Sequence, residues 1–453
     1  MRRLQQLFIL VLLAHGPSAY AQTLLEDWQK AQKNDPSLRA AQKEDLIAQA
    51  LRMQMDALWK PSLVFYGTAG ATTRYSITRD AKFAAPGFSA SGAKFETWNE
   101  LAAMGQASIQ WMQPLHDPKL RQRAEQLKLS AEAVGLSETL AQQRLLAGLI
   151  ENTLAFTQVT ERWRFAQRQV AVMQKTFEEI SKRQRLGDAT LTDRSEAFER
   201  LQSAKASLSG IEAAGRVHAE WVADVTGRET RPRILSQGLS SSLIKMDTIE
   251  TYVQAMKTSH PQLKLLRLER DIARAQAAQF LEGEKAMTVQ AVASAQQELV
   301  TSRDILPFGY QAGSAFVGLQ LSIPLSTGGR MTAQEREWLA RADVAEENHQ
   351  AMALVLERGM RDSWYGYWSA AERLPMLEQA MEAGAERLRQ TQKSYRVGAR
   401  TILELLGAET DHIEAQRMVF EARLSLLSYR SRLSAAMGTL DESDIDRIDR
   451  FLR

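Results

Sequence analysis

The sequence predicts a mainly α-helical fold with a small β part, in which one long unit occurs twice. Matching landmark residues recur in both halves of the chain at nearly equal spacings. Long segments between these landmarks are almost free of helix-breaking residues, and stretches of alternating polar and apolar residues precede each long segment. Together with the duplication, these stretches predict four strands per chain, two in each half.

The chain opens with the pattern of a secretory signal peptide. Arg2 and Arg3 give a positively charged start, residues 7–14 form an apolar run, and residues 19–21 (Ala-Tyr-Ala) form a small-x-small cleavage site. We therefore expect the mature chain to begin at Gln22. The apolar run is too short for a membrane anchor, because a spanning helix needs about 20 apolar residues.

Composition excludes several classes of protein. The net charge is only +3 and the chain has no cysteine, so neither a concentrated basic surface for nucleic acid nor a disulfide or thiolate site is expected. No apolar stretch of 18 or more residues follows the signal, so entry into a membrane would require a closed β-barrel. The sequence contains no G-x-S-x-G, no H-E-x-x-H and no phosphate-binding glycine loop. We therefore expect no catalytic residue, no cofactor and no metal site.

The two halves share four landmarks. Pro36 matches Pro261, Pro114-Leu115 matches Pro324-Leu325, Arg185-Leu186-Gly187 matches Arg396-Val397-Gly398, and Thr226-Gly227 matches Met437-Gly438. Pro114 and Gly187 are 73 residues apart, and Pro324 and Gly398 are 74 apart. Such regular spacing predicts two long copies in a pseudo-symmetric fold. A repeat array of many short units would have a period of about 20–50 residues.

The landmarks divide the chain into five parts. We expect a signal peptide at 1–21, a first repeat at 22–230, a linker at 231–248, a second repeat at 249–445 and a C-terminal tail at 446–453. Each repeat should contain a helix, two strands, a long helix and a return helix.

Long helices follow the proline landmarks. Residues 119–186 and 330–397 are rich in Ala, Leu, Glu, Gln and Arg, which are good helix formers. A helix of this length would extend about 100 Å. Pro375 should interrupt and kink the second helix. Gly187 and Gly398 should end these helices, because glycine accepts the left-handed conformation at a helix terminus.

The return helices carry a stripe of small residues at alternating steps of four and three, which is typical of a close coiled coil. The stripe begins at Ala197 in the first copy and at Ala408 in the second. His218 and His412 lie on this stripe, and we interpret them as packing residues.

Alternating stretches at residues 106–111, 287–294 and 314–323 predict strands with one apolar and one polar face. This pattern is typical of transmembrane barrels, although half-buried soluble sheets share it. Four strands cannot close a barrel around a pore, so closure would require several subunits. The first copy has 15 more residues before its second proline than the second copy, and they fall around residues 79–100. This segment is rich in Gly, Ser and Ala and is predicted to form a loop.

Together these features resemble the TolC family of outer-membrane efflux and secretion channel proteins. The most specific stretches are residues 321–330, residues 395–406 and residues 436–440, and the likeness runs from about residue 24 to 448. The chain lacks the acylated cysteine of the metal-efflux lipoprotein branch, which favours the secretion and drug-efflux branch.

The resemblance implies a homotrimer in the outer membrane of a Gram-negative cell. Each chain would give four strands to one shared transmembrane β-barrel, and the helices would form a long coiled-coil helical barrel in the periplasm. Such a protein is a passive exit duct of a tripartite efflux pump or a type I secretion system, gated at its periplasmic end. Its partners would be a periplasmic adaptor (membrane fusion protein), an inner-membrane ABC or RND-type pump and outer-membrane lipid, without nucleic acid.

The resemblance also assigns a gate. Arg400 and Tyr395, beside the second helical turn, correspond to residues that bond to a Thr-Asp pair after the first turn, here Thr192 and Asp193. An arginine–carboxylate bond is strong but reversible, which suits a gate. An unrelated surface pair is the alternative interpretation.

A constriction and a docking surface follow in the same way. Glu404 occupies one position of the family's acidic constriction ring, but Gly407 occupies the other, so ion selectivity is left open. A solvated helix residue is the alternative for Glu404. The expected adaptor-docking tips are Leu186, Gly187, Asp188, Val397, Gly398 and Ala399.

A periplasmic coiled-coil adaptor or scaffold that does not enter the membrane is the main alternative function. It would explain the signal peptide and the helices but not two matched pairs of amphipathic strands. Because a duct is generic, the sequence identifies neither the cargo, nor the pump and adaptor, nor the resting aperture.

Overall fold

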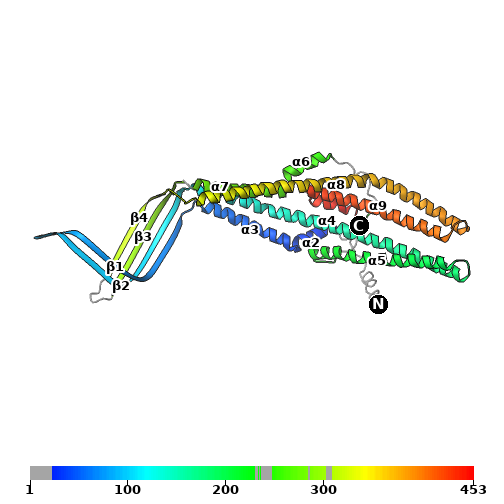
Figure 1. Cartoon of the computed structure of the whole chain (residues 1–453), viewed down its shortest axis with the longest axis horizontal. Helices are drawn as coiled ribbons and strands as arrows, with labels where there is room; N and C mark the ends of the chain where they lie inside the picture. The colour runs from blue at the N-terminus through cyan, green and yellow to red at the C-terminus, as the bar shows by residue number, and fades with distance from the viewer. Residues whose placement is uncertain are drawn as a thin grey trace. The chain divides into compact units, whose positions relative to one another are not determined.

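The structure is a computed structural model (Figure 1), and it describes residues 23–229, 233, 235, 247–283, 286–302 and 309–452. The expected signal peptide and most of the expected linker lie outside these residues. Two compact units are present. A helical unit comprises Met1–Ala48, Glu132–Leu268 and Ala345–Arg453, and a second unit, which contains the sheet, comprises Gln49–Ala131 and Glu269–Val344.

The expected mainly helical fold with a small sheet is confirmed. The helices are α2 (Leu24–Asn34), α3 (Pro36–Ala57), α4 (Pro118–Arg185), α5 (Leu191–Thr226), α6 (Ile249–Ser259), α7 (Pro261–Gly283), α8 (Arg330–Arg396), α9 (Ile402–Met437) and α10 (Glu442–Asp449). The strands are β1 (Ser62–Ala85), β2 (Phe88–His116), β3 (Thr288–Ser302) and β4 (Gly309–Ser322). Both halves share one element order, with long helices of 68 and 67 residues and return helices of 36 residues each. Among the described helices, none contains an apolar stretch that would span a bilayer.

A proline separates the two short helices that open each half. Pro36 begins α3 and Pro261 begins α7, because proline lacks the N–H that the first turn of a helix leaves unbonded. The residue before each proline caps the second helix. The Asp35 carboxylate accepts a hydrogen bond from the Leu38 amide at 2.8 Å, and His260 Nδ1 accepts one from the Gln262 amide at 3.1 Å.

The expected interruption at Pro375 is wrong, because α8 continues through this proline. A proline within a helix costs one backbone hydrogen bond. The preceding turns of α8 are held by burial, since Tyr367, Ala371 and Leu374 are all at most 5% exposed in the hydrophobic core. Packing of this segment therefore outweighs the local preference of proline.

The four strands form one antiparallel sheet in the order β1-β2-β3-β4. Register places Leu63 of β1 beside Trp111 of β2, Trp111 beside Ala293 of β3, and Ala293 beside Val317 of β4. Side chains alternate between the faces of a sheet, so these four residues share one face. Gln110, Ser294 and Phe316 fall on the other.

The loop expected at residues 79–100 is also wrong. Strands β1 and β2 stay paired as far as Ala85 and Phe88, and the chain turns at Pro86 and Gly87, where the glycine has φ +89°. The segment is therefore the outer part of a hairpin. Small residues can alternate in a strand, so a composition rich in Gly, Ser and Ala did not distinguish a loop from a strand here.

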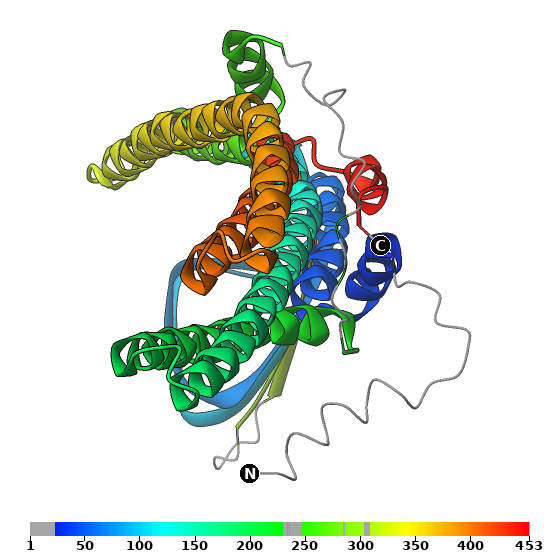
Figure 2. The same ribbon diagram turned by 90° about the vertical axis from the view of Figure 1, so that its right-hand side faces the viewer.

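The main hydrophobic core lies in the helical unit and joins the two ends of the chain. Leu24 and Trp28 of α2 pack in the same cluster as Ile445 and Ile448 of α10. Helix α10 contacts α2 directly, as the view in Figure 2 shows. The segment expected as a C-terminal tail thus includes part of a packed helix and the buried Leu452.

Candidate functional site

The expected docking tips are the turns between the long helices and the return helices. Leu186 is 70% exposed and Val397 is 80% exposed, and the other expected tip residues are exposed as well. Both turns have the same backbone geometry. The Asp188 amide donates to the Arg183 carbonyl at 2.9 Å, and the Ala399 amide donates to the Ser394 carbonyl at 2.9 Å. This Schellman pattern needs a left-handed residue, which Gly187 and Gly398 supply with φ values of +84° and +77°.

Asp193 lies at the start of α5, where it completes a capping box with Thr190. The Thr190 hydroxyl accepts a hydrogen bond from the Asp193 amide at 3.1 Å, and the Asp193 carboxylate accepts from the Thr190 amide at 2.9 Å. Hydrogen bonds from Thr190, the backbone bond first, lower the pKa of Asp193. Thr192 is exposed on the same first turn.

Glu404 has the same position at the start of α9. It forms a capping box with Thr401, whose amide donates to the Glu404 carboxylate at 2.8 Å. The Arg400 guanidinium also forms an ion pair with Glu404. Two hydrogen bonds lower the pKa of Glu404. The larger effect comes from the Thr401 backbone amide, and the next comes from the Arg400 side chain. The structure therefore brings together two predicted site residues, Arg400 and Glu404, within one helix start.

Helices α4 and α5 form one helical hairpin, and α8 and α9 form a second. Tyr395, in the last turn of α8, contacts α4 of the first hairpin. Its hydroxyl donates to the Glu179 carboxylate of α4, and this bond, together with burial, raises the pKa of Tyr395. The charge of Arg183 of α4 opposes this rise in the pKa of Tyr395 and contributes to the lowered pKa of Asp193. Arg183 thus interacts with both Tyr395 and Asp193.

The four expected gate residues do not bond to one another in the part of the chain that the structure describes. Among the described residues, no hydrogen bond joins Arg400 or Tyr395 to Thr192 or Asp193. The residues that sequence reasoning missed are Glu179, Arg183, Thr190 and Thr401. The spacing of a threonine three residues before an acid, at 190–193 and 401–404, would have identified both caps. No sequence signal placed Glu179 or Arg183 opposite Tyr395.

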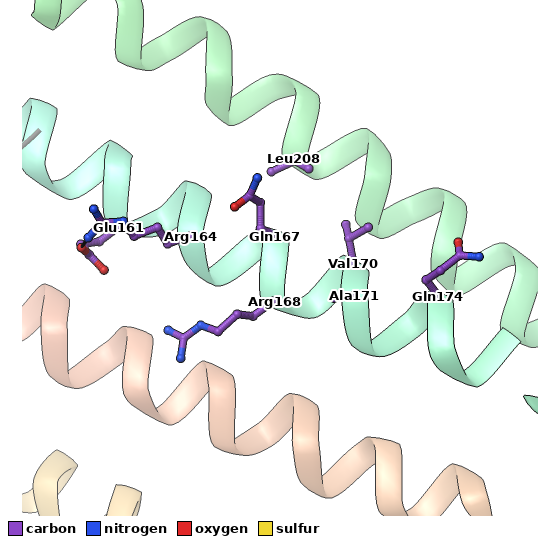
Figure 3. Close-up of a pocket in the computed structure, with 8 residues that line it drawn as sticks. All are labelled: Glu161, Arg164, Gln167, Arg168, Val170, Ala171, Gln174 and Leu208. Carbon is purple, nitrogen blue, oxygen red and sulfur yellow. Dashed lines mark hydrogen bonds and ion pairs between the residues drawn. The ribbon is translucent and has the colours of Figure 1, made fainter. Parts of the chain in front are cut away.

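A shallow groove of about 750 Å³ lies along α4 and α5 (Figure 3). The residues that line it are Glu161, Arg164, Gln167, Arg168, Val170, Ala171, Gln174 and Leu208. Both arginines are engaged, because Arg164 pairs with Glu161 and Arg168 stacks on Phe165, with 4.5 Å from its guanidinium carbon to the ring centroid. An anion in the groove would therefore meet only two arginines, Arg164 and Arg168, that already have partners.

The histidines of the return helices take part in hydrogen bonds. His218 Nδ1 lies 2.9 Å from the Asn152 amide oxygen, and His412 Nε2 lies 3.0 Å from the Gln416 amide nitrogen. Within the described ranges, no group of three or more His, Asp or Glu side chains is arranged to hold a metal ion.

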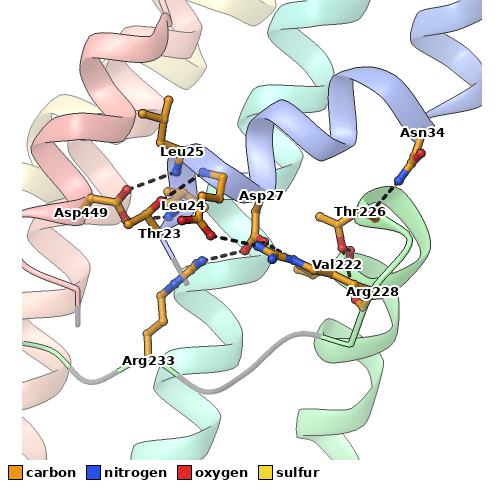
Figure 4. Close-up of polar contacts among 11 residues, drawn as sticks. Thr23, Leu24, Leu25, Asp27, Asn34, Val222, Thr226, Arg228, Arg233 and Asp449 are labelled. Atoms are coloured by element: carbon orange, nitrogen blue, oxygen red, sulfur yellow. Dashed lines mark hydrogen bonds and ion pairs between the residues drawn. The ribbon is translucent and has the colours of Figure 1, made fainter. Parts of the chain in front are cut away.

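A second polar cluster joins the ends of the chain (Figure 4). The Asp449 carboxylate accepts from the Leu24 amide at 2.8 Å and from the Leu25 amide at 3.1 Å, which caps the start of α2. Asp27, only 1% exposed, forms ion pairs with Arg228 and with Arg233, the latter at 2.6 Å. Buried charges require such partners, so this cluster has a structural role.

Sequence comparison finds relatives among outer membrane proteins. Residues 252–439, about two fifths of the chain, match the family described as outer membrane efflux protein. "Outer membrane protein TolC" of Salmonella enteritidis is 26% identical over 133 residues, and "Alkaline protease secretion protein AprF" of Pseudomonas aeruginosa is 27% identical over 132 residues. Each of these two matches spans 29% of this chain and 27% of the relative.

Two further matches cover nearly the whole chain. "Outer membrane protein TolC" of Vibrio cholerae is 21% identical over 456 residues, spanning 100% of this chain and 99% of the relative. The crystal structure of the outer membrane protein VceC from Vibrio cholerae superposes with a TM-score of 0.68 at 18% identity, covering 92% of this chain and 96% of that one. The fold is therefore shared along most of the chain. Residues 252–439 thus match the family described as outer membrane efflux protein, and the chain as a whole is similar to an outer membrane protein of nearly equal length.

Proposed function

We propose that the protein is a subunit of an outer membrane exit duct, in which three copies close one β-barrel from four strands each. The observation that carries this proposal is the sheet. One face exposes large apolar side chains, with Leu63 at 68%, Phe65 at 66%, Val317 at 83% and Leu319 at 68%. Water disfavours such a face, whereas lipid accommodates it.

The edges of the sheet support sharing between copies. Strands β1 and β4 are the edge strands, so each has unpaired backbone groups along one side. Lipid leaves no water to satisfy these groups, and pairing β1 of one copy with β4 of the next would satisfy them. A ring of copies can close in this way.

The helical unit would form the periplasmic part of the duct. The first repeat, at 22–230, and the second, at 249–445, would each contribute helices to this part and two strands to the barrel. Arg400, Tyr395, Thr192 and Asp193 would form the gate network, and Glu404 would contribute to the constriction ring. The two exposed turns would dock a periplasmic adaptor that connects the duct to an inner-membrane pump of the ABC or RND type. Their exposed apolar residues, Leu186 and Val397, support a docking role.

The cargo is a small molecule or a protein, depending on the pump. The relatives' names include both a family of efflux proteins and a protein for secretion of alkaline protease. We propose no catalytic activity, because the names of the matched family and relatives describe efflux, secretion and outer membrane proteins.

The test is single-channel conductance of the detergent-purified protein in a planar bilayer, together with its mass in solution. A trimer with small, flickering conductance is the expected result. A soluble species that never inserts would support the alternative, a periplasmic scaffold.

The outer hairpin gives an independent test of topology. In the proposed duct, residues 79–100 face the outside of the cell. Surface protease added to intact cells should cleave within this hairpin, and protection of the hairpin in cells whose surface is otherwise digested would contradict the proposed orientation.

A further inference from the structure

The sheet consists of two β-hairpins, β1/β2 and β3/β4, that can be aligned through the two landmark prolines. Pro114 and Pro324 are 210 residues apart. The same offset aligns Met112 of β2 with Ser322 of β4. Strands β2 and β4 are therefore equivalent, and each leads into one of the two long helices.

The pairing within each β-hairpin aligns β1 with β3. Met112 pairs with Ser62 of β1. Ser322, its equivalent, pairs with Thr288 of β3. Ser62 thus aligns with Thr288, at an offset of 226 residues. The helices before these strands agree with this alignment, because the prolines that begin α3 and α7 are 225 residues apart.

The junction between the two β-hairpins supplies a template for the junction between copies. Within the chain, β2 pairs with β3, and Met112 lies opposite Val292. In a closed ring, β4 would pair with β1 of the next copy. The strands of a closed barrel share one tilt and a fixed stagger, so equivalent junctions should have the same register. The β1 residue equivalent to Val292 is Tyr66, 226 positions earlier.

We propose that β4 of one copy pairs antiparallel with β1 of the next in the register that places Ser322 opposite Tyr66 and Gln320 opposite Thr68. This inference rests on the proposed duct and specifies the contact through which its copies would join. Ser322 and Tyr66 both lie on the face of the sheet that carries Gln110. The register therefore continues each face of the sheet from one copy to the next.

The side chains that would meet on the apolar face are complementary in size. Leu321 and Leu319 of β4 are exposed in one chain. In the proposed register, they lie opposite Gly67 and Ala69 of β1. Large residues opposite small ones interdigitate without overlap. A register shifted by two residues, with Leu321 opposite Phe65, would instead bring two large side chains together.

Glycines would meet on the other face of the sheet. Gly318 of β4 lies opposite Gly70 of β1 in the proposed register. A Cβ at Gly318 would come within 2.7 Å of the Phe316 ring, so this ring covers the glycine of its own strand. A Cβ at Gly70 would meet open space. Because an aromatic ring over an edge glycine helps to fix strand register, Phe316 favours one alignment of the two edges.

The chain has no cysteine, so engineered disulfides can report the register directly. Directly opposite residues have Cα atoms about 4.5–5.5 Å apart, within reach of a disulfide. Diagonal neighbours are about 7–8 Å apart, beyond its usual reach. Gln320→Cys is combined, in the full-length protein, with Thr68→Cys, Tyr66→Cys or Gly70→Cys. After oxidation, the Thr68 variant should migrate on a non-reducing denaturing gel mainly as a covalent trimer, and the other two mainly as single chains.

Thr68→Cys with Gln106→Cys is the matched control, because these two residues pair within one chain. Its disulfide should protect both cysteines from a maleimide label without linking copies. If this bond does not form, the alignment of the β-hairpins is wrong and the proposed register falls with it.

The remaining outcomes separate the register from the duct. A covalent trimer from the Tyr66 or Gly70 variant, in place of the Thr68 variant, would overturn the register and leave the proposed duct standing. The register also falls if the control bond forms in a non-covalent trimer and none of the three combinations links copies. A control bond in a protein that stays a single chain in solution would overturn both proposals.

Discussion

Gly366 of α8 lies against the ring of Tyr429 of α9, and a Cβ at this position would overlap that ring. The stripe that begins at Ala408 reaches Tyr429 when its steps of four and three are continued along the sequence. It did not reveal that a glycine on the opposing helix provides the space. Close approach of two helices is a property of the pair, so the pattern of either helix alone identifies only half of the contact.

This contact predicts opposite effects for two glycines of one helix. Gly366→Ala should destabilise the helical unit by about 1–3 kcal/mol, because the methyl group overpacks against Tyr429. Gly359→Ala, two turns earlier with open space around it, should stabilise the helix by about 1 kcal/mol. Thermal unfolding followed by circular dichroism at 222 nm measures both. A similar rise in Tm for both variants would show that the Tyr429 contact is absent.

His260 predicts a dependence of stability on pH. Burial lowers the pKa of His260 below its usual 6.5, so the folded state favours the neutral ring. Its stabilising contribution is complete above the pKa of the unfolded chain and is lost as pH falls below about 6.5 toward the folded-state pKa. Protonation would also remove Nδ1 as the acceptor for the Gln262 amide.

The measurement compares Tm at about pH 7.5 and about pH 5.5 for the unsubstituted protein and for His260→Asn. Asparagine retains an oxygen that can cap α7, as Asp35 caps α3. The variant should lose less stability on acidification than the unsubstituted protein. An equal loss in both would assign the pH dependence to other groups.

At the scale of elements, the caps at the turns have a specific role. Thr190 begins α5 and Thr401 begins α9, each with a complete capping box. Both caps lie directly after the exposed turns, so they determine how firmly the first turn of each return helix is held where a partner would dock.

Thr401→Ala should fray the first turn of α9, whereas Thr401→Ser should not, because serine keeps the hydroxyl that accepts from the Glu404 amide. A cap of this kind is worth about 1 kcal/mol, so amide hydrogen exchange in the first turn should become about fivefold faster in the alanine variant. Unchanged exchange in this turn would mean that the Arg400–Glu404 pair alone holds it.

The sequence predicted long elements more reliably than short ones. The paired helices were visible because helix formers continue between the proline and glycine landmarks, and the turns were visible because Gly187 and Gly398 must adopt positive φ. The outer hairpin at 79–100 was missed because its turn, at Pro86 and Gly87, lies among small residues that are common in loops. Local composition cannot tell whether such a segment finds a pairing partner.

In the candidate site, the sequence predicted the two turns and the charged or titratable residues beside them, which are Asp193, Tyr395, Arg400 and Glu404. It could not predict pairing between hairpins, since Glu179 and Tyr395 are 216 residues apart. The resemblance to the family predicts a bond between Arg400 and Asp193. In the structure of one chain, Arg400 instead pairs with Glu404, four residues later. Whether Arg400 reaches Asp193 in the assembled duct stays a prediction.

At the scale of the whole molecule, α10 stabilises the start of the chain. Ile445 is fully buried, and the Trp28 indole donates to the Glu442 carboxylate at 2.8 Å. Deleting residues 442–453 would expose Leu24 and Trp28 and remove the cap that Asp449 gives to α2.

The deletion should therefore release α2, and limited proteolysis should cleave the chain before residue 35. Ile445→Ala is a milder variant that should lower stability by about 2–5 kcal/mol without removing the Asp449 cap. If α2 stays resistant to protease in the deleted chain, the other contacts of α2, such as the Asp27 ion pairs, are sufficient to hold it.

The Asp449 cap has a consequence for the order in which the protein matures. The Asp449 carboxylate that caps α2 lies 425 residues after the Leu24 amide that it binds, so the ribosome makes the donor long before the acceptor. Until Asp449 has also been exported, α2 lacks its N-terminal partner and the apolar surface of α10. Contacts so distant in sequence form slowly. Chaperones that shield nascent chains would therefore find the newly exported N-terminus exposed for as long as the rest of the polypeptide takes to follow.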